Sequence, residues 1–237
     1  MTTQTATPGA PKAPAVALDI LPIVASEPAA EYSYGDMIVP VGDSTDLDIP
    51  SLIAQGVEDT ITPTSWTKWG RVNRNAEAEA WHFYCTDAKF ETLLRDPLKL
   101  IETKATHAVE VNVSTFEEDP LPVALAGLFR RRCVSRIWQE AGVRVAVDLN
   151  VSGITRELVL EGVPKTHGLY ATKYQKRDLD GEDMGIDQLL DDFLLADDHV
   201  DENVPFDFIV YGGGKKVIDL CDEYGWIHVP SVSARRV

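Results

Sequence analysis

The sequence is poor in cysteine and has no long hydrophobic run. Its three cysteines, Cys85, Cys133 and Cys221, are an odd number with wide spacing, which argues against a disulfide framework and against a CxxC metal or redox motif. The apolar runs are much shorter than the roughly 20 residues that span a bilayer. The chain also begins without the basic leader and apolar core of a secretory signal. We therefore expect no membrane segment and a cytoplasmic protein.

Several catalytic and binding motifs are also missing. The sequence has no GxSxG, HExxH, GxGxxG or GxxxxGK[ST] pattern, and its five histidines are isolated from one another and from the cysteines, so no zinc site is expected. The DLDGED stretch at 178–183 places Gly181 fourth and Leu189 twelfth, where an EF-hand needs Gly sixth and Glu twelfth. No metal or cofactor is indicated, and the sequence leaves open whether the protein is an enzyme.

Basic residues are scarce, with 22 Lys and Arg against 38 Asp and Glu and a net charge of −16. Most of this excess is local. Residues 178–207 hold twelve acidic residues and no Lys or Arg, and residues 1–50 hold seven acidic residues and one Lys, so these segments carry −12 and −6 and leave about +2 for the rest. A uniformly acidic surface would repel nucleic acid, but this distribution leaves the remaining chain able to meet an anion.

We expect three segments along the chain. Residues 1–20 are rich in Thr, Ala and Pro and cannot bury enough apolar surface to offset their ordering entropy, which predicts a disordered tail. Residues 21–80 hold short apolar pieces between Pro, Gly and Asp, typical of an irregular strap or a small appended segment. Trp66 and Trp69 are placed to anchor it, with a surface aromatic pair for a partner as the alternative. Residues 81–237 form an α/β domain that includes the acidic segment 178–207.

Strand-like and helix-like stretches alternate from Trp81 onward. β-branched and aromatic runs predict strands, and apolar residues spaced three or four apart predict helices. The expected strands are 81–85, 108–114, 143–151, 168–174, 206–212 and 226–230, and the expected helices are 86–102, 122–141, 155–163, 186–200 and 215–225. This alternation predicts an α/β fold with a mainly parallel sheet of about six strands. An open layered sheet and an incomplete barrel both fit, and the open sheet is favoured because six strands fall short of eight.

These stretches carry a resemblance to a known family. An aromatic strand with an Asp, a strand with a Ser-containing motif, an Arg-rich helix, a Gly-initiated strand, a GxP turn and a late strand ending in Tyr-Gly follow one another as in domain-of-unknown-function family 4417. The matching residues are Asp87, Ser114, Arg132, Arg136, Gly142, Gly162, Pro164, Tyr211 and Gly212. Members occur in bacteria, archaea, phages and mobile elements. The resemblance implies a phage or mobile-element accessory protein, in the cytoplasm of a bacterial host if phage-encoded, and no particular chemistry.

The chain departs from the family pattern at two places. It has Asn112, Val113 and Ser114 where the family usually has Asp-Phe-Ser, and it has Asp148 and Asn150 where the family usually has an aromatic residue. The resemblance therefore leaves in doubt any activity that depends on the family's Asp.

Polar residues at the expected strand ends form the first candidate site. Ligands of open α/β sheets bind beyond the carboxyl ends of the strands, and the residues there are Asp87, Asn112, Ser114, Asp148, Asn150, Lys173 and Tyr211. Asp87 and Asp148 suit Mg²⁺, because hard cations prefer oxygen ligands. The alternative is that these residues are helix caps and loop polars.

The second candidate is the YGGGKK stretch, which lies between an expected strand and an expected helix. Gly212 and Gly213 would let backbone N–H groups approach an anion after Tyr211, and Lys215 at the start of the helix would add positive charge. A tight strand-to-helix turn is the alternative.

The third candidate is an arginine-rich helix. Arg132 and Arg136 lie four residues apart on one helical face, where their guanidinium groups suit a phosphate or a carboxylate. Internal ion pairs with the 178–207 segment are the alternative.

Together these observations favour an accessory protein that binds a phosphate-bearing ligand or nucleic acid through the strand ends, the glycine turn and the arginine helix. One alternative is a non-enzymatic interaction module whose acidic segment, residues 178–207, docks on a basic protein partner. The other is a metal-dependent phosphotransfer enzyme, which requires that Asp87 and Asp148 share an ion.

Overall fold

The structure is a computed structural model that describes residues 33–34, 37–57, 62–70, 78–175 and 185–231. The disordered tail and the DLDGED stretch considered above lie outside these ranges. Among the described residues, no helix is long and apolar enough to cross a membrane.

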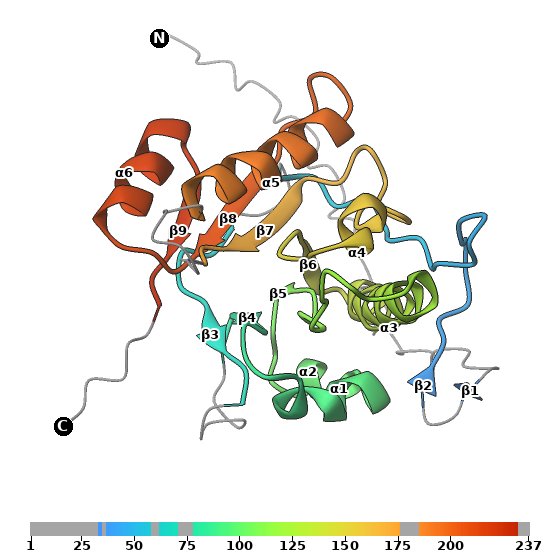
Figure 1. Cartoon of the computed structure of the whole chain (residues 1–237). Helices are drawn as coiled ribbons and strands as arrows, with labels where there is room; N and C mark the ends of the chain where they lie inside the picture. The colour runs from blue at the N-terminus through green and yellow to red at the C-terminus, as the bar shows by residue number, and fades with distance from the viewer. Residues whose placement is uncertain (1–32, 35–36, 58–61, 71–77, 176–184, 232–237) are drawn as a thin grey trace, which may run out of the picture.

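The main sheet has seven parallel strands in the order β3-β4-β5-β6-β7-β8-β9 (Figure 1). They are β3 (Thr67–Lys68), β4 (Ala80–His82), β5 (His107–Val109), β6 (Arg144–Asp148), β7 (Leu169–Lys173), β8 (Asp207–Tyr211) and β9 (Ile227–Val229). The helices are η2 (Asp87–Lys89), α1 (Glu91–Arg95), α2 (Leu98–Ile101), α3 (Leu121–Glu140), α4 (Ile154–Leu158), α5 (Gly185–His199) and α6 (Lys215–Tyr224), and β1 (Ser33–Tyr34) pairs with β2 (Met37–Ile38) outside the sheet. The predicted α/β fold with an open parallel sheet is confirmed, with seven strands in place of about six.

The strand order explains the curled shape of the sheet. The connections between neighbouring parallel strands are right-handed. Because the order of the strands in the sheet follows their order in the chain, every connection lies on the same face of the sheet. The helices therefore lie on one face, and the sheet curls into a half-barrel whose other face is concave (Figure 1). The ring of His82 on β4 lies 4.1 Å from the ring of Tyr211 on β8, although three strands separate β4 from β8 in the sheet.

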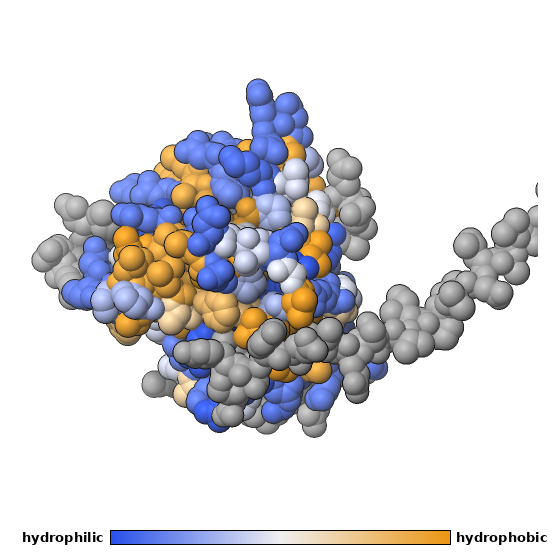
Figure 2. Space-filling view, turned by 90° about the vertical axis from the view of Figure 1, so that its right-hand side faces the viewer, coloured by the Kyte–Doolittle hydropathy of each residue, from blue (hydrophilic) through white to orange (hydrophobic). Residues whose placement is uncertain are grey.

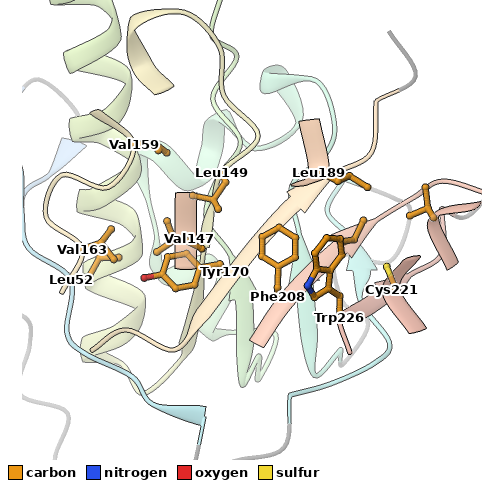
Figure 3. Packing of buried hydrophobic residues seen from close by; sticks show 13 residues of the cluster. Leu52, Val147, Leu149, Val159, Val163, Tyr170, Leu189, Phe208, Cys221 and Trp226 are labelled. Atoms are coloured by element: carbon orange, nitrogen blue, oxygen red, sulfur yellow. The ribbon is translucent and has the colours of Figure 1, made fainter. Parts of the chain in front are cut away.

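Two clusters of buried side chains fill the space between the sheet and its helices. In one, shown in Figure 3, Val147, Tyr170 and Phe208 from the strands pack with Leu189 of α5 and Cys221 of α6. The other joins β4, β5 and β6 to α1, α2 and α3 and includes three tryptophans and two phenylalanines, Trp69, Trp81, Trp138, Phe83 and Phe90. Alternate strand residues supply both clusters, as a pleated strand requires.

The concave face carries a third cluster that includes no helix residue. It contains three alanines and three aromatic residues, and its members are Trp66, Ala80, Tyr84, Val109, Ala146, Leu169, Ala171, Ile209, Tyr211 and Val229. Trp66 and Trp69 are both buried. They therefore anchor the strap to the main domain, as predicted, and are not a surface pair.

Local breaks separate some observed elements from the predicted ones. The helix expected over 86–102 is divided into η2, α1 and α2. Pro97, which lacks an N–H and restricts Asp96 before it, separates α1 from α2. The strand expected over 108–114 ends at Val109. Further along, the Val113 N–H donates to the carbonyl of Val111, two residues earlier, and not to an adjacent strand. The strand β3 was not predicted, because two residues are too few to show an alternating pattern.

Candidate functional site

The carboxyl ends of β4, β5 and β6 meet at Asp148, the last residue of β6. The Tyr84 hydroxyl donates to Asp148 Oδ1 at 3.1 Å, and Asn112 Nδ2 donates to Oδ2 at 2.6 Å. The Asn150 N–H also donates to Oδ1, at 3.1 Å, while Asn112 Nδ2 reaches the Asn150 carbonyl at 3.1 Å. The structure thus brings three of the predicted rim residues, Asn112, Asp148 and Asn150, into one network.

Burial sets the proton affinity of this network. It raises the pKa of Asp148 to about 6, although Arg131 and the Asn112 hydrogen bond act in the opposite direction. Burial and then the neighbouring Asp148 carboxylate raise the pKa of Tyr84 well above its usual value. Near neutral pH, Tyr84 is therefore a neutral donor, and Asp148 is a carboxylate close to its titration point, a state suited to proton exchange.

Asp87 and Ser114 form a separate pair on the rim. Ser114 Oγ donates to Asp87 Oδ1 at 2.8 Å, and the Ser114 N–H donates to Oδ2 at 3.1 Å. Both oxygens of Asp87 are thus bonded to a single residue. Within the described residues, no group of three or more His, Cys, Asp or Glu side chains is placed to hold a metal ion. The Mg²⁺ role of Asp87 and Asp148 stays a prediction.

The concave face contains a buried histidine at the same end of the sheet. His82, the last residue of β4, is 1% exposed, and its ring packs against Tyr211 at 4.1 Å and Tyr84 at 5.6 Å. Among the residues that the structure describes, neither of its ring nitrogens has a hydrogen-bond partner. Because Tyr84 also bonds Asp148, the histidine and the carboxylate flank the same tyrosine.

Two lysines lie near His82 on the concave face. Lys68 is the register partner of His82 on β3, and Lys173 is the register partner of Tyr211 on β8. Burial, followed by Lys68 and Lys173, lowers the pKa of His82 to about 3. The imidazole is therefore neutral at physiological pH and keeps one N–H donor, in surroundings that are locally positive.

The glycine turn follows Tyr211 directly and leads into α6. Gly212 and Gly213 have φ of 87° and 89°, and a Cβ on Gly213 would lie 2.5 Å from the Val217 side chain. Among the described residues, no side chain caps the N-terminus of α6, and Lys215 is exposed there. The predicted rim and the predicted glycine turn are therefore continuous through Tyr211, which stacks on Tyr84 at 5.3 Å.

The arginine-rich helix faces inward at Arg132. Its guanidinium group is fully buried and donates to Glu110 Oε1 and to the carbonyls of Val159 and Glu161. Arg131, also buried, donates to Glu110 Oε2 at 2.9 Å. This placement disfavours the anion-binding role predicted for Arg132, because its donors are used inside the protein. Although burial alone would raise the pKa of Glu110, the two arginines lower it to about 2.

Arg136 lies one turn further along α3 and lines a pocket. Its Nε donates to Glu140 at 2.8 Å and its Nη1 donates to the Ser51 carbonyl at 2.6 Å. The pocket, about 260 Å³ in volume, is bounded by the segment 39–50 and by Phe129. Anion binding by Arg136 stays a prediction, with Glu140 as its observed partner.

The described part of the acidic segment pairs with a different arginine. Arg156 Nη1 lies 2.5 Å from Asp192 Oδ1, and Asp192 also accepts from the Thr172 hydroxyl at 2.5 Å. In the part of the chain that the structure describes, neither Arg132 nor Arg136 pairs with this segment. Their acidic partners there are Glu110 and Glu140, and pairing with residues 178–184, which lie outside the described ranges, stays a prediction.

Sequence reasoning missed the residues that face the concave side. His82 and Tyr84 were assigned to a strand, but their common face was not connected with Tyr211, because the curl that brings β4 to β8 leaves no mark in periodicity. Lys68 belongs to the unpredicted β3. Glu110 offered the one usable signal, since a carboxylate in the apolar run AVEVNV requires a buried partner.

Comparison with known families gives one match. The family model described as domain of unknown function (DUF4417) matches residues 42–171, which include the Asp148 network, Glu110 and its arginines but not the glycine turn. Neither the curated proteins nor the solved structures include a match to this chain.

Proposed function

Since the chain belongs to the DUF4417 family, whose description assigns no activity, we propose a function from the site itself: the protein binds a small phosphate-bearing ligand on the concave face of its sheet. The ligand would lie at the carboxyl ends of the strands, between His82 and the glycine turn. We keep the phage or mobile-element setting and the cytoplasmic location as parts of this proposal, which rest on the resemblance and on composition.

The state of His82 carries the proposal. A buried imidazole without a hydrogen-bond partner loses its water contacts and gains nothing in exchange, and buried polar groups in proteins are nearly always bonded. Both ring nitrogens of His82 are in this state. A ligand that accepts the single N–H of the neutral ring would remove the cost.

Charge favours an anion as that ligand. Lys68 and Lys173 flank the histidine closely enough to lower its pKa, so the potential around the ring is positive. An oxyanion would accept from His82 and interact with both ammonium groups, and charge-assisted hydrogen bonds of this kind are the stronger ones. A cation would meet repulsion from the same two lysines.

The adjoining turn favours phosphate among the anions. The Gly212 N–H donates to the Val229 carbonyl at 2.8 Å, but Gly213, with a positive φ, leads into α6, whose N-terminus has no side-chain cap among the described residues. A helix N-terminus with free N–H groups attracts phosphate, and the exposed Lys215 adds positive charge. The turn supports the proposal and does not carry it alone.

A small ligand fits better than nucleic acid. Arg132, which the nucleic-acid hypothesis used, is buried against Glu110, and a long polyanion would also meet the exposed acidic residues of α5, such as Asp197 and Asp198. The acidic segment docking on a basic protein and the metal-dependent phosphotransfer reaction stay predictions.

Isothermal titration calorimetry of the full chain with inorganic phosphate and with adenosine monophosphate tests the proposal. Lys173→Met keeps the aliphatic stem and removes the charge, and His82→Phe keeps a ring and removes both nitrogens. Each variant is expected to weaken binding at least about tenfold, which corresponds to about 1.4 kcal/mol.

Lys99→Met is the matched control, because Lys99 is exposed on α2 and its removal changes the net charge equally. It should bind as the unaltered chain does. Absence of binding by the unaltered chain at millimolar ligand, or equal losses in Lys173→Met and Lys99→Met, would refute the concave site.

A further inference from the structure

The second part of the loop between β5 and α3, residues 114–120, and the start of α3 present apolar side chains to solvent. Phe116 is 62% exposed, and Leu121 and Val123 at the start of α3 are 49% and 53% exposed. These three residues lie within eight positions of the chain. Figure 2 looks at the side of the molecule on which α3 lies, and it shows a hydrophobic area with hydrophilic residues around it. Exposed apolar groups in such a cluster are typical of an interaction site.

Side-chain hydrogen bonds hold the loop at both ends. Asp87 accepts from the Ser114 hydroxyl and N–H at 2.8 and 3.1 Å, and Asp119 Oδ2 accepts from the Phe116 N–H at 2.8 Å. Ser152 Oγ donates to the Thr115 carbonyl at 2.9 Å, and the Ser152 N–H donates to Thr115 Oγ1 at 2.9 Å. The segment that carries Phe116 is therefore tied to η2 and to the β6–α4 connection.

Close backbone packing fixes the middle of the loop. Gly153 has a φ of 57°, and a Cβ at this position would lie 2.8 Å from the carbonyl oxygens of Phe116 and Glu117. Only glycine allows this approach. Phe116 is thus exposed on a loop that is held in one conformation, so a partner would lose little conformational entropy by binding it.

The charges around Phe116 define the partner. Glu117 and Glu118 are exposed beside it, while Asp119 is occupied by the Phe116 N–H. Acidic groups next to an aromatic anchor repel nucleic acid and favour a surface that carries Lys or Arg. Interface anchors are most often rigid aromatic residues surrounded by polar groups.

From this geometry we infer that the Phe116 surface, formed by Phe116, Glu117, Glu118, Leu121 and Val123, binds a basic protein segment whose apolar side chains are flanked by Lys or Arg. The apolar side chains of the segment cover Phe116 and the start of α3, and its basic side chains pair with the two glutamates. This surface is independent of the anion site on the concave face and of the acidic helix α5.

Selection from a random peptide library displayed on phage tests the inference with the full chain as bait. The enriched peptides are expected to combine apolar residues with Lys or Arg. Fluorescence polarisation then gives their affinities for the variants. Phe116→Ser should weaken binding at least about tenfold, and Glu117→Gln with Glu118→Gln should weaken it several-fold and reduce its salt dependence.

Two controls on α5 match these variants. Leu194→Ser removes an apolar side chain that is 52% exposed, and Asp197→Asn with Asp198→Asn removes two exposed charges; both should bind within about twofold of the unaltered chain. Unchanged melting temperatures show that the variants fold. The inference fails if the library yields no basic apolar peptides, if Phe116→Ser binds them as tightly, or if the α5 controls lose as much.

Discussion

Asp148 carries a carboxyl group that is fully buried in the fold. Burial favours its protonated form, and the Arg131 guanidinium and three hydrogen bonds from Tyr84, Asn112 and Asn150 favour the ionised form. Burial is the larger effect and raises the pKa to about 6. Because the folded state holds this proton more tightly than the unfolded state, Asp148 contributes stability at low pH, and that contribution is lost as the pH rises through 6.

The variant Asp148→Asn isolates this contribution. The free energy of unfolding of the unaltered chain minus that of Asp148→Asn should be larger at pH 4 than at pH 7, by roughly 2 kcal/mol. Urea unfolding at both pH values measures it. Buried histidines, whose lowered pKa values act in the opposite direction over the same range, are common to both proteins and cancel.

An equal difference at the two pH values would contradict a raised pKa for Asp148. A difference that grows toward pH 7 would mean that the carboxylate is the favoured form in the folded protein. Tyr84→Phe serves as the companion variant, since it removes the hydroxyl that bonds Asp148 without adding a titrating group in this range.

Glu110 is a residue whose burial the sequence could indicate but whose partners it could not. Its position in an apolar strand indicated a buried charge, but the sequence did not identify the partners, because Arg131 and Arg132 lie on a helix whose orientation depends on packing. Of these two, Arg132 was predicted to meet an external anion. Spacing along a helix shows which residues share a face, and it does not show whether that face is turned toward solvent.

At the scale of elements, the β8–α6 turn depends on one glycine more than on its neighbours. Gly213 combines a φ of 89° with a Cβ position 2.5 Å from Val217, so a side chain there meets both backbone strain and a clash. Gly214, the next residue, has a φ of −113° and no atom within 4 Å of a Cβ. The two positions differ in conformation although the sequence shows an unbroken run of glycine.

Gly213→Ala is therefore expected to lower the free energy of unfolding by about 1–3 kcal/mol. Gly214→Ala is the control and should change it by less than about 1 kcal/mol, the usual cost at an N-cap. Thermal or urea unfolding measures both. Similar losses in the two variants would show that the turn does not have the described conformation.

The elements themselves were largely predictable. Six of the seven strands follow from runs of β-branched and aromatic residues, and the long helices α3, α5 and α6 follow from apolar residues spaced three or four apart. These patterns did not predict the helix break at Pro97, which follows from the geometry of proline. They did not predict β3 either, because its two residues are too few to form a run.

At the scale of the whole molecule, Trp69 joins the strap to the sheet. Its ring packs edge-on against Trp81 at 5.1 Å and lies 5.7 Å from Phe83. If the strap and the α/β domain unfold as one unit, Trp69→Ala should lower the stability of the entire chain by about 3–5 kcal/mol. Leu194→Ala, at an exposed position on α5, should change it by less than about 0.5 kcal/mol.

Circular dichroism and tryptophan fluorescence report on this prediction from different parts of the molecule. Both signals should shift together in Trp69→Ala. A shift in fluorescence alone, with the helical signal unchanged, would mean that residues 62–69 detach while the rest stays folded.

The curl of the sheet could not be predicted from the sequence. This curl forms the candidate site. Alternation predicted parallel strands but not their order, and an open sheet and an incomplete barrel had the same pattern. The order became visible only in the structure, where it places His82 against Tyr211. A site formed between strands at positions two and six of a sheet has no signature in either strand alone.

The uninterrupted strand order also bears on how the protein is made. Each strand pairs with the strand that came before it in the chain, so a growing polypeptide can add one βα unit at a time to a finished edge without waiting for a distant partner. Synthesis by the ribosome and assembly of the sheet would then advance in the same direction, with each new strand protecting the edge of the previous one.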